Sequence, residues 1–139
     1  MTDIFSKEKR SEIMSLIKPR NTKPELKIFR ELRRRNIYFQ KHYDRIKGRP
    51  DIALPRKKIA IFIDGDFWHG YRFARYKARL PKKYWQGKIE GNIKRDKRNR
   101  SKLRREGWRC LRVWEHEIKK DFDRTVQKVV NFLIKGKSD

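Results

Sequence analysis

Cysteine is almost absent from this chain, since Cys110 is the only one among 139 residues. One cysteine excludes an internal disulfide, which favours a reducing compartment, and it excludes a multi-cysteine zinc site. Long apolar runs are also missing, so no segment approaches the roughly 20 residues of a membrane helix. The first residues lack the apolar stretch of a signal peptide. We therefore expect a cytoplasmic protein that makes no membrane contact.

Acidic residues are scarce relative to basic ones. The chain has 41 Lys and Arg against 17 Asp and Glu, which gives a formal net charge of +24. This excess runs along the whole chain and is not confined to a tail. A surface adapted to high temperature would carry both signs of charge, whereas here the acids lag far behind. The charge therefore favours a polyanionic partner, bound through its phosphates with release of counterions.

The length suits one domain with a single core, so we assign residues 1–139 to one domain. Apolar periodicity and turn signals predict helices and strands in a mixed order. The expected helices cover residues 6–16, 22–35, 82–106 and 121–134. The expected strands cover residues 37–42, 51–54, 58–63 and 108–114. This order predicts an α/β fold, in which a central mixed β-sheet is flanked by α-helices.

Two short segments carry most of the chemical information. Residues 48–51 read GRPD and residues 64–70 read DGDFWHG, on either side of an apolar strand. We expect an antiparallel hairpin that brings Asp51, at the start of one strand, to Asp64, at the end of the next. Carboxylates suit Mg²⁺, and acids near a histidine at a strand end favour metal-assisted hydrolysis. The alternative is that Pro50 and Asp51 form an ordinary turn.

The histidine and the aromatic residues in this region each allow two interpretations. His69 is either a general acid or base or a structural histidine that hydrogen-bonds within a loop. Phe67, Trp68 and Trp85 are either core residues or wedges that enter a DNA base stack. The basic helix over residues 82–106 combines a solvated face with a phosphate track. The basic residues that we expect to contact DNA are Arg49, Lys94, Arg95 and Arg98.

The chain resembles the very short patch repair endonuclease family. Its members are small DNA nicking enzymes of the PD-(D/E)xK superfamily, with a restriction-endonuclease-like fold, that cut beside a T:G mismatch. The matching motifs are Arg10, Ser11, Met14, Thr22, Glu25, residues 48–51, residues 67–69, Trp85, Lys88, Ile89, Asn92, residues 95–96, residues 107–109 and residues 113–115. They occur in the right order over most of the chain, which makes chance a poor explanation.

The resemblance implies a role for individual residues. Asp51 would be the main Mg²⁺ ligand, with Mn²⁺ as a substitute ion, and the backbone carbonyl of Ile63 would be the second ligand. His69 would be the catalytic histidine, with Glu25 supporting the site. The residues that would intercalate beside the mismatch are Phe67, Trp68 and Trp85. The implied partners are double-stranded, mismatched DNA and other mismatch-repair proteins, and a helical arm over residues 1–20 would contact the DNA.

This chain also departs from the family pattern. Well-known members carry a structural zinc, with a cysteine at the position of Asp66 and further ligands just after His69. Here the ligands after His69 are missing, so we expect no zinc and an ion pair or hydrogen bond between Asp66 and His116 instead. Asp64 stands where typical members have a histidine that pairs with the Glu25 position. Nearby acids repel unless a cation or a basic residue separates them, so Asp64 is a candidate extra metal ligand in the catalytic site.

The sequence as a whole predicts a Mg²⁺-dependent DNA endonuclease at the nucleoid that nicks one strand, next to a T:G mismatch. The nearest alternative is a related nuclease with another trigger, such as a restriction companion or a structure-specific enzyme. A rival of another class is a non-catalytic basic nucleic-acid-binding protein. The net charge suits that rival, but the residues at 48–51 and 64–70 would then have no purpose.

Overall fold

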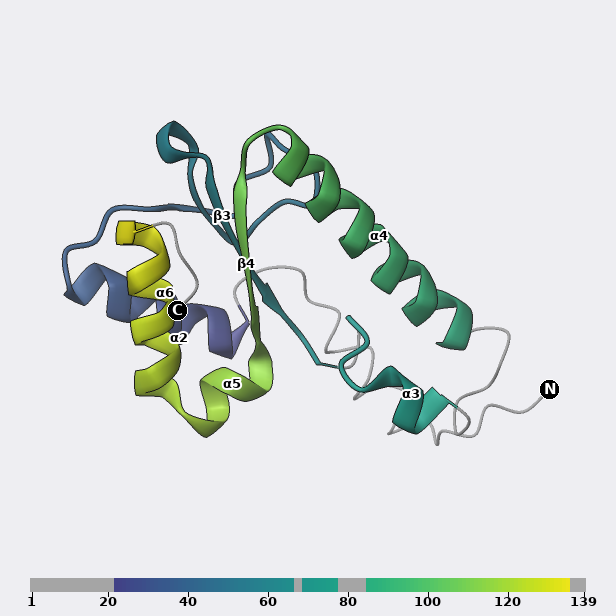
Figure 1. Cartoon of the computed structure of the whole chain (residues 1–139). Coiled ribbons are helices and arrows are strands. Elements are labelled where there is room, and N and C mark those ends of the chain that lie inside the picture. Colours follow the sequence, from purple (N-terminus) through teal and green to yellow (C-terminus); the bar gives the residue numbers. More distant parts are fainter. Residues whose placement is uncertain (1–21, 67–68, 78–84, 136–139) are drawn as a thin grey trace.

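A computed structural model describes residues 22–66, 69–77 and 85–135 of the chain (Figure 1). Its central four-stranded sheet has the order β1 (Gln40–Lys41), β2 (Ile52–Leu54), β3 (Ile59–Asp64) and β4 (Arg109–Trp114). The first three strands pair antiparallel, and β3 pairs parallel with β4. The helices are α2 (Lys23–Arg34), α3 (Phe73–Tyr76), α4 (Gly87–Arg105), α5 (Glu115–Lys120) and α6 (Phe122–Lys135), and the short helix η1 (Pro55–Lys57) joins β2 to β3. The predicted α/β class, a mixed sheet flanked by helices, is confirmed.

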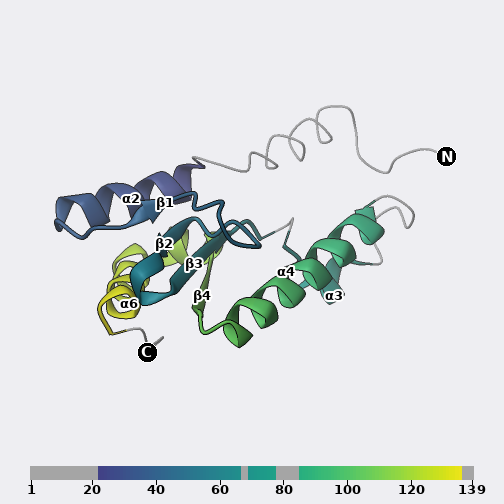
Figure 2. The same ribbon diagram turned by 90° about the horizontal axis from the view of Figure 1, so that it is seen from above.

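Alternation of side chains along β3 divides the helices into two layers. The three isoleucines of β3 belong to the main core, together with α2, α5 and α6. Ala60 and Phe62 belong to a second core that includes Leu103 of α4. Figures 1 and 2 show α2 and α6 on one side of the sheet and α4 on the other. The side chain of Asp64 lies on the same face of β3 as those of Ala60 and Phe62, so the strand directs it toward α4.

Helix α2 begins as the sequence predicts, with a capping box. The Thr22 side chain accepts a hydrogen bond from the Glu25 backbone N–H, and the Glu25 carboxylate accepts one from the Thr22 N–H. These bonds satisfy backbone donors that a helix start leaves free. They also hold Glu25, which is only 2% exposed, in the first turn. Local capping thus fixes an acid at the end of the helix that faces the sheet.

Three segments differ from the prediction. Of the strand expected over residues 37–42, only Gln40–Lys41 pairs with β2, because Ile37 and Phe39 pack against the main core instead. The basic region after His69, expected to be irregular, contains the four-residue helix α3. The element α5 was not predicted at all. The helix expected over residues 6–16 lies outside the described residues. None of the helices among the described residues has the length and apolar character of a membrane span.

Candidate active site

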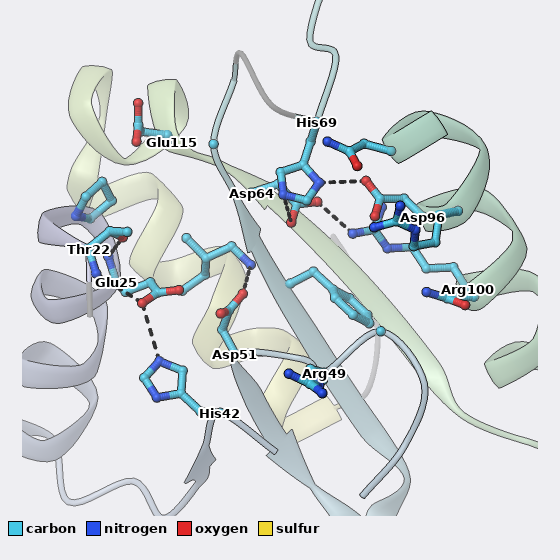
Figure 3. Close-up of a pocket in the computed structure, with 18 of the residues that line it drawn as sticks. Thr22, Glu25, His42, Arg49, Asp51, Asp64, His69, Asp96, Arg100 and Glu115 are labelled. Carbon is cyan, nitrogen blue, oxygen red and sulfur yellow. Dashed lines mark hydrogen bonds and ion pairs between the residues drawn. The ribbon is translucent and has the colours of Figure 1, made fainter. Parts of the chain in front are cut away.

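A pocket of about 470 Å³ opens at the end of the sheet where β3 finishes. Its walls come from the start of α2, the segment before β2, the end of β3 and α4. Figure 3 shows two groups of side chains in this pocket, on the two sides of a strand. The first, here named the Asp51 cluster, consists of Glu25, His42 and Asp51. The second, here named the His69 cluster, consists of Asp64, His69 and Asp96. In each, three donor atoms lie within 4.8 Å of one another.

Strand pairing places Asp51 at the end of β3, as the predicted hairpin requires. The Asp51 N–H donates to the carbonyl of Ile61 at 3.0 Å, and an Asp51 carboxylate oxygen accepts the Ile63 N–H at 2.7 Å. Carbonyls two residues apart in a strand point toward the same neighbour. The Ile63 carbonyl is therefore directed, like that of Ile61, to the Asp51 side of β3. This direction suits a second metal ligand, which remains a prediction.

The Asp51 cluster brings buried acids together. Burial raises the pKa of Asp51 well above its ordinary value of 3.8, and the hydrogen-bonded, charged Glu25 raises it further, whereas the Ile63 N–H lowers it. Asp51 is 9% exposed and Glu25 is 2% exposed. Mg²⁺ binds hard oxygen ligands and commonly uses one or two carboxylates. The donor set, with two acids and a carbonyl at its edge, therefore fits a divalent cation.

His42 belongs to this cluster, although no sequence motif assigns it a role. Its Nε2 atom lies 3.4 Å from a carboxylate oxygen of Glu25. Its backbone N–H donates to the Asp51 carbonyl at 2.9 Å, which extends the β1–β2 ladder by one step. A strand was expected over residues 37–42 without a partner, and only its pairing with β2 in the structure places His42 beside Asp51.

The His69 cluster centres on an imidazole held by an acid of α4. The Nδ1 atom of His69 lies 2.6 Å from Asp96, and its Nε2 atom lies 3.7 Å from Asp64. Burial by itself lowers the pKa of His69, but the Asp96 hydrogen bond and the charges of Asp64 and Asp96 outweigh it, so the net pKa is raised. Asp96 follows Arg95 in a motif that the resemblance matched, yet only the fold reveals that it contacts His69.

Asp64 is paired with basic residues, which was one of the predicted ways to accommodate it. It forms ion pairs with Arg100 at 2.6 Å and with Arg112 at 2.8 Å. Arg112 also lies 3.1 Å from Asp96. The structure therefore places Asp64 in the His69 cluster and not in the cluster of Asp51 and Glu25. Its role as an extra metal ligand remains a prediction, and two guanidinium groups compete with a cation for its oxygens.

The predicted DNA-contacting residues lie around this pocket where the structure describes them. Lys94, Arg95 and Arg98 are exposed on α4, and Arg49 is exposed in the segment before Asp51. Arg49 and Arg95 also line the pocket. Two of the predicted wedges, Phe67 and Trp68, lie outside the described residues. The third, Trp85, is 2% exposed, so its ring would have to turn outward to meet a base stack, and this role remains a prediction.

Asp66 and His116 form the contact that the sequence predicted in place of a zinc site. The His116 Nδ1 atom lies 2.8 Å from a carboxylate oxygen of Asp66, as predicted. The Tyr71 ring covers the imidazole, with centroids 4.0 Å apart, and also contacts Trp114 at 5.2 Å. A hydrogen bond inside an aromatic cluster thus ties the loop after β3 to the start of α5.

Comparison with known proteins identifies relatives. The family described as DNA mismatch endonuclease Vsr matches residues 2–75. Type II nicking enzyme V.XorIIP of Xanthomonas oryzae pv. oryzae is 38% identical, over 85% of this chain and 88% of its own. Type II nicking enzyme V.NmeDIP of Neisseria meningitidis serogroup C is 34% identical, over 91% and 87%. DNA mismatch endonuclease Vsr of Escherichia coli strain K12 is 34% identical, over 83% and 74%.

A solved structure shares the fold. The catalytic domain of homing endonuclease I-Bth0305I matches 83% of this chain and 97% of its own length, with a TM-score of 0.59 and 24% sequence identity. At that identity the similarity concerns architecture alone. The fold is restriction-endonuclease-like, as predicted.

Proposed function

This chain belongs to the DNA mismatch endonuclease Vsr family, and we propose on that premise that it is a Mg²⁺-dependent enzyme that nicks one strand of duplex DNA beside a T:G mismatch. Family membership makes it a DNA endonuclease and sets aside the rival interpretation as a non-catalytic binding protein. The observation that carries the proposal is one pocket that holds both the Asp51 cluster and the His69 cluster.

The Asp51 cluster is proposed to hold the cation. Asp51 and the Ile63 carbonyl would bind Mg²⁺, or Mn²⁺ in its place, with Glu25 beside them. A bound divalent cation supplies Lewis-acid stabilisation of the charge that develops on the phosphate. The raised pKa of Asp51 supports this role, because a cation would favour the ionised carboxylate that burial and Glu25 disfavour.

His69 is proposed to exchange a proton during phosphodiester hydrolysis. Because Asp96 accepts a hydrogen bond at Nδ1, the ring is left with Nε2 as the atom that takes a proton from the attacking water. The raised pKa of His69 makes the ring a stronger base, and it also means that the ring is free of its proton only at higher pH. Asp96 is a positioning residue in this scheme.

DNA is proposed to bind to the basic surface formed by α4 and the rim of the pocket. Lys94, Arg95 and Arg98 on α4 and Arg49 at the pocket would contact phosphates, which position DNA without reading its sequence. Phe67 and Trp68 would wedge into the base stack, where unstacking is least costly at a mismatch. The single domain over residues 1–139 would include an N-terminal arm over residues 1–20 that also contacts DNA.

The test uses end-labelled duplexes that each carry a different central mismatch, with a fully paired duplex as control, in Mg²⁺ or in EDTA. We expect one strand to be nicked, at T:G and only with Mg²⁺. Asp51→Asn should bind DNA without cutting, and the double variant Phe67→Ala/Trp68→Ala should lose the preference for T:G. Full activity in EDTA would refute the metal mechanism. Equal cutting of paired and mismatched duplexes would refute mismatch recognition.

A nicking nuclease with another trigger is the second candidate. Two observations favour it: several relatives are named type II nicking enzymes, and Asp64 replaces the histidine of typical members. A restriction companion or a structure-specific enzyme would share the same pocket chemistry. Branched and bulged duplexes, tested beside the mismatch set, separate this candidate from the first.

A further inference from the structure

We propose that His42 is a third side-chain ligand of the cation in the Asp51 cluster, which shifts the preference of the site from Mg²⁺ toward transition-metal ions. This inference rests on the proposed metal site and adds to it a nitrogen donor that neither the motifs nor the resemblance assign.

The His42 imidazole is within reach of an ion that Glu25 and Asp51 share. Its Nε2 atom is 3.4 Å from Glu25, and one donor atom of each of the three residues lies within 4.8 Å of the other two. Ligands about 2.1 Å from an octahedral ion lie roughly 3 Å apart when adjacent and roughly 4.2 Å apart when opposite. Small side-chain shifts therefore bring all three onto one ion. Figure 3 shows the His42 ring pointing toward Glu25, on the same side of the strand as Asp51.

The backbone at His42, whose ring points toward Glu25, has an uncommon conformation. Its φ is +50°, in the left-handed region, which costs a residue with a Cβ roughly 1–3 kcal/mol. The conformation persists because the His42 N–H is tied to the Asp51 carbonyl at 2.9 Å and the ring packs edge-on against Phe29, with centroids 5.5 Å apart. The side chain is 11% exposed, so the ring is directed into the protein and not toward solvent.

A nitrogen ligand changes which ions the site prefers. Mg²⁺ favours oxygen donors and keeps its waters, whereas imidazole suits the later first-row transition metals. A site made only of Asp51, Glu25 and a carbonyl would have little preference for such ions over Mg²⁺. With His42 as a ligand, the site should bind Co²⁺ much more tightly than Mg²⁺. Co²⁺ is thus a probe that reports on His42 without any DNA or catalytic turnover.

The experiment measures Co²⁺ and Mg²⁺ binding to the full chain by calorimetry and records the visible spectrum of the Co²⁺ form. His42→Gln keeps a polar group that can contact Glu25 but removes the imidazole. We expect it to lose roughly tenfold or more in Co²⁺ affinity, with little change for Mg²⁺, and to lose the spectral signature of nitrogen ligation. His69→Gln is the matched control, because His69 lies in the other cluster. This variant should keep the Co²⁺ affinity and the spectral signature of nitrogen ligation.

The outcomes separate this inference from the proposed function. If His42→Gln bound Co²⁺ like the wild type, His42 would merely support Glu25 and the inference would be wrong, while the metal mechanism would stand. If His69→Gln lost Co²⁺ binding and His42→Gln did not, the ion would occupy the His69 cluster. If neither the wild-type chain nor Asp51→Asn bound Co²⁺ or Mg²⁺, both proposals would fail. The Co²⁺-shifted imidazole signals of the wild-type chain give the answer by NMR should His42→Gln fail to fold.

Discussion

The Nδ1 atom of His69 lies 2.6 Å from a carboxylate oxygen of Asp96, so an acid on α4 orients the imidazole that follows β3. Replacing Asp96 by Asn keeps the shape of the side chain but removes its charge. General acid–base catalysis contributes roughly 10²–10⁴-fold, so we expect Asp96→Asn to slow nicking by at least about 10²-fold. Single-turnover assays measure the rate, and anisotropy in EDTA should show unchanged DNA affinity. Asp123→Asn, an exposed acid on α6, is the control that should leave both unchanged.

Asp51 gives the metal-free protein a specific dependence of stability on pH. Its folded pKa is raised above 3.8, first by burial and then by Glu25, so in that window the folded state binds more protons than the unfolded state. The free energy of unfolding should therefore fall as the pH rises from about 4 through the folded pKa, with a slope approaching roughly 1.4 kcal/mol per pH unit. Urea titrations in EDTA test this.

Two comparisons make the dependence on Asp51 specific. Asp51→Asn carries no ionisable group, so in EDTA its stability should fall less with pH than that of the wild type. Adding Mg²⁺ or Mn²⁺ at pH 8 should stabilise the wild type and leave Asp51→Asn nearly unchanged. A wild-type profile that matched Asp51→Asn would contradict the raised pKa.

Gly70, directly after His69, is expected to tolerate no side chain. Its φ is +78°, and a Cβ there would overlap the side chain of Ile93 on α4. Left-handed backbone alone costs an alanine roughly 1–2 kcal/mol. We expect Gly70→Ala to lower the free energy of unfolding by at least that amount and to slow nicking through His69, as measured by urea unfolding and single-turnover assays. Gly91→Ala, inside α4 with open space around it, should instead stabilise by up to about 1 kcal/mol.

Sequence patterns predicted the helices and strands that are determined by residues close together in the chain. The capping box at Thr22 and Glu25 and the continuous apolar run of β3 depend on neighbours in the chain, and both elements form where expected. The helix α5 was not predicted because it follows β4 without a break. Its cap is also unusual, since the backbone N–H of Trp114 donates to Glu117. A short helix held by one buried residue, Ile118, leaves little periodicity to detect.

The contacts within the site depended on the tertiary fold. Asp51 and His69 stand in recognisable motifs, but their partners do not. Asp96 reaches His69 from 27 positions away, and Arg100 reaches Asp64 from 36 positions away, because β3 directs Asp64 toward α4 and His69 follows that strand. The basic composition of α4 concealed Arg100, which is 8% exposed and turned inward among residues that otherwise resemble a solvated phosphate track. Composition cannot tell a buried arginine from an exposed one.

The hydrogen bond between Asp66 and His116 should make folding independent of zinc. We expect elemental analysis of the purified chain to find far less than one zinc per molecule, and strong chelators to leave its thermal unfolding unchanged. A double-mutant cycle with Asp66→Asn and His116→Gln should give a coupling energy of roughly 0.5–3 kcal/mol, as for contacting residues in one network. Stoichiometric zinc, or unfolding by a chelator, would show that the metal site persists with other ligands.

Asp64 should resist replacement by histidine, the residue of typical family members. It is 4% exposed and neutralises Arg100 and Arg112, with distances of 2.6 Å and 2.8 Å. Asp64→His would remove the carboxylate that pairs with Arg100 and leave Arg112 with Asp96 alone, and breaking a buried ion pair costs roughly 3–5 kcal/mol. We expect a loss of that order in the free energy of unfolding, measured by urea titration. Asp44→His, at an exposed acid, should change it little.

Removing the stranded charges should restore part of the lost stability. In the triple variant Asp64→His/Arg100→Met/Arg112→Met the apolar side chains fill similar volume and leave no unpaired cation near the histidine, so we expect it to be more stable than Asp64→His alone. With Arg100→Met/Arg112→Met measured as well, the cycle gives the coupling energy between Asp64 and the two arginines. If Asp64→His alone were as stable as the wild type, Asp96 would suffice to neutralise the arginines. Asp64 would then be available to a cation, as its place in the sequence first indicated.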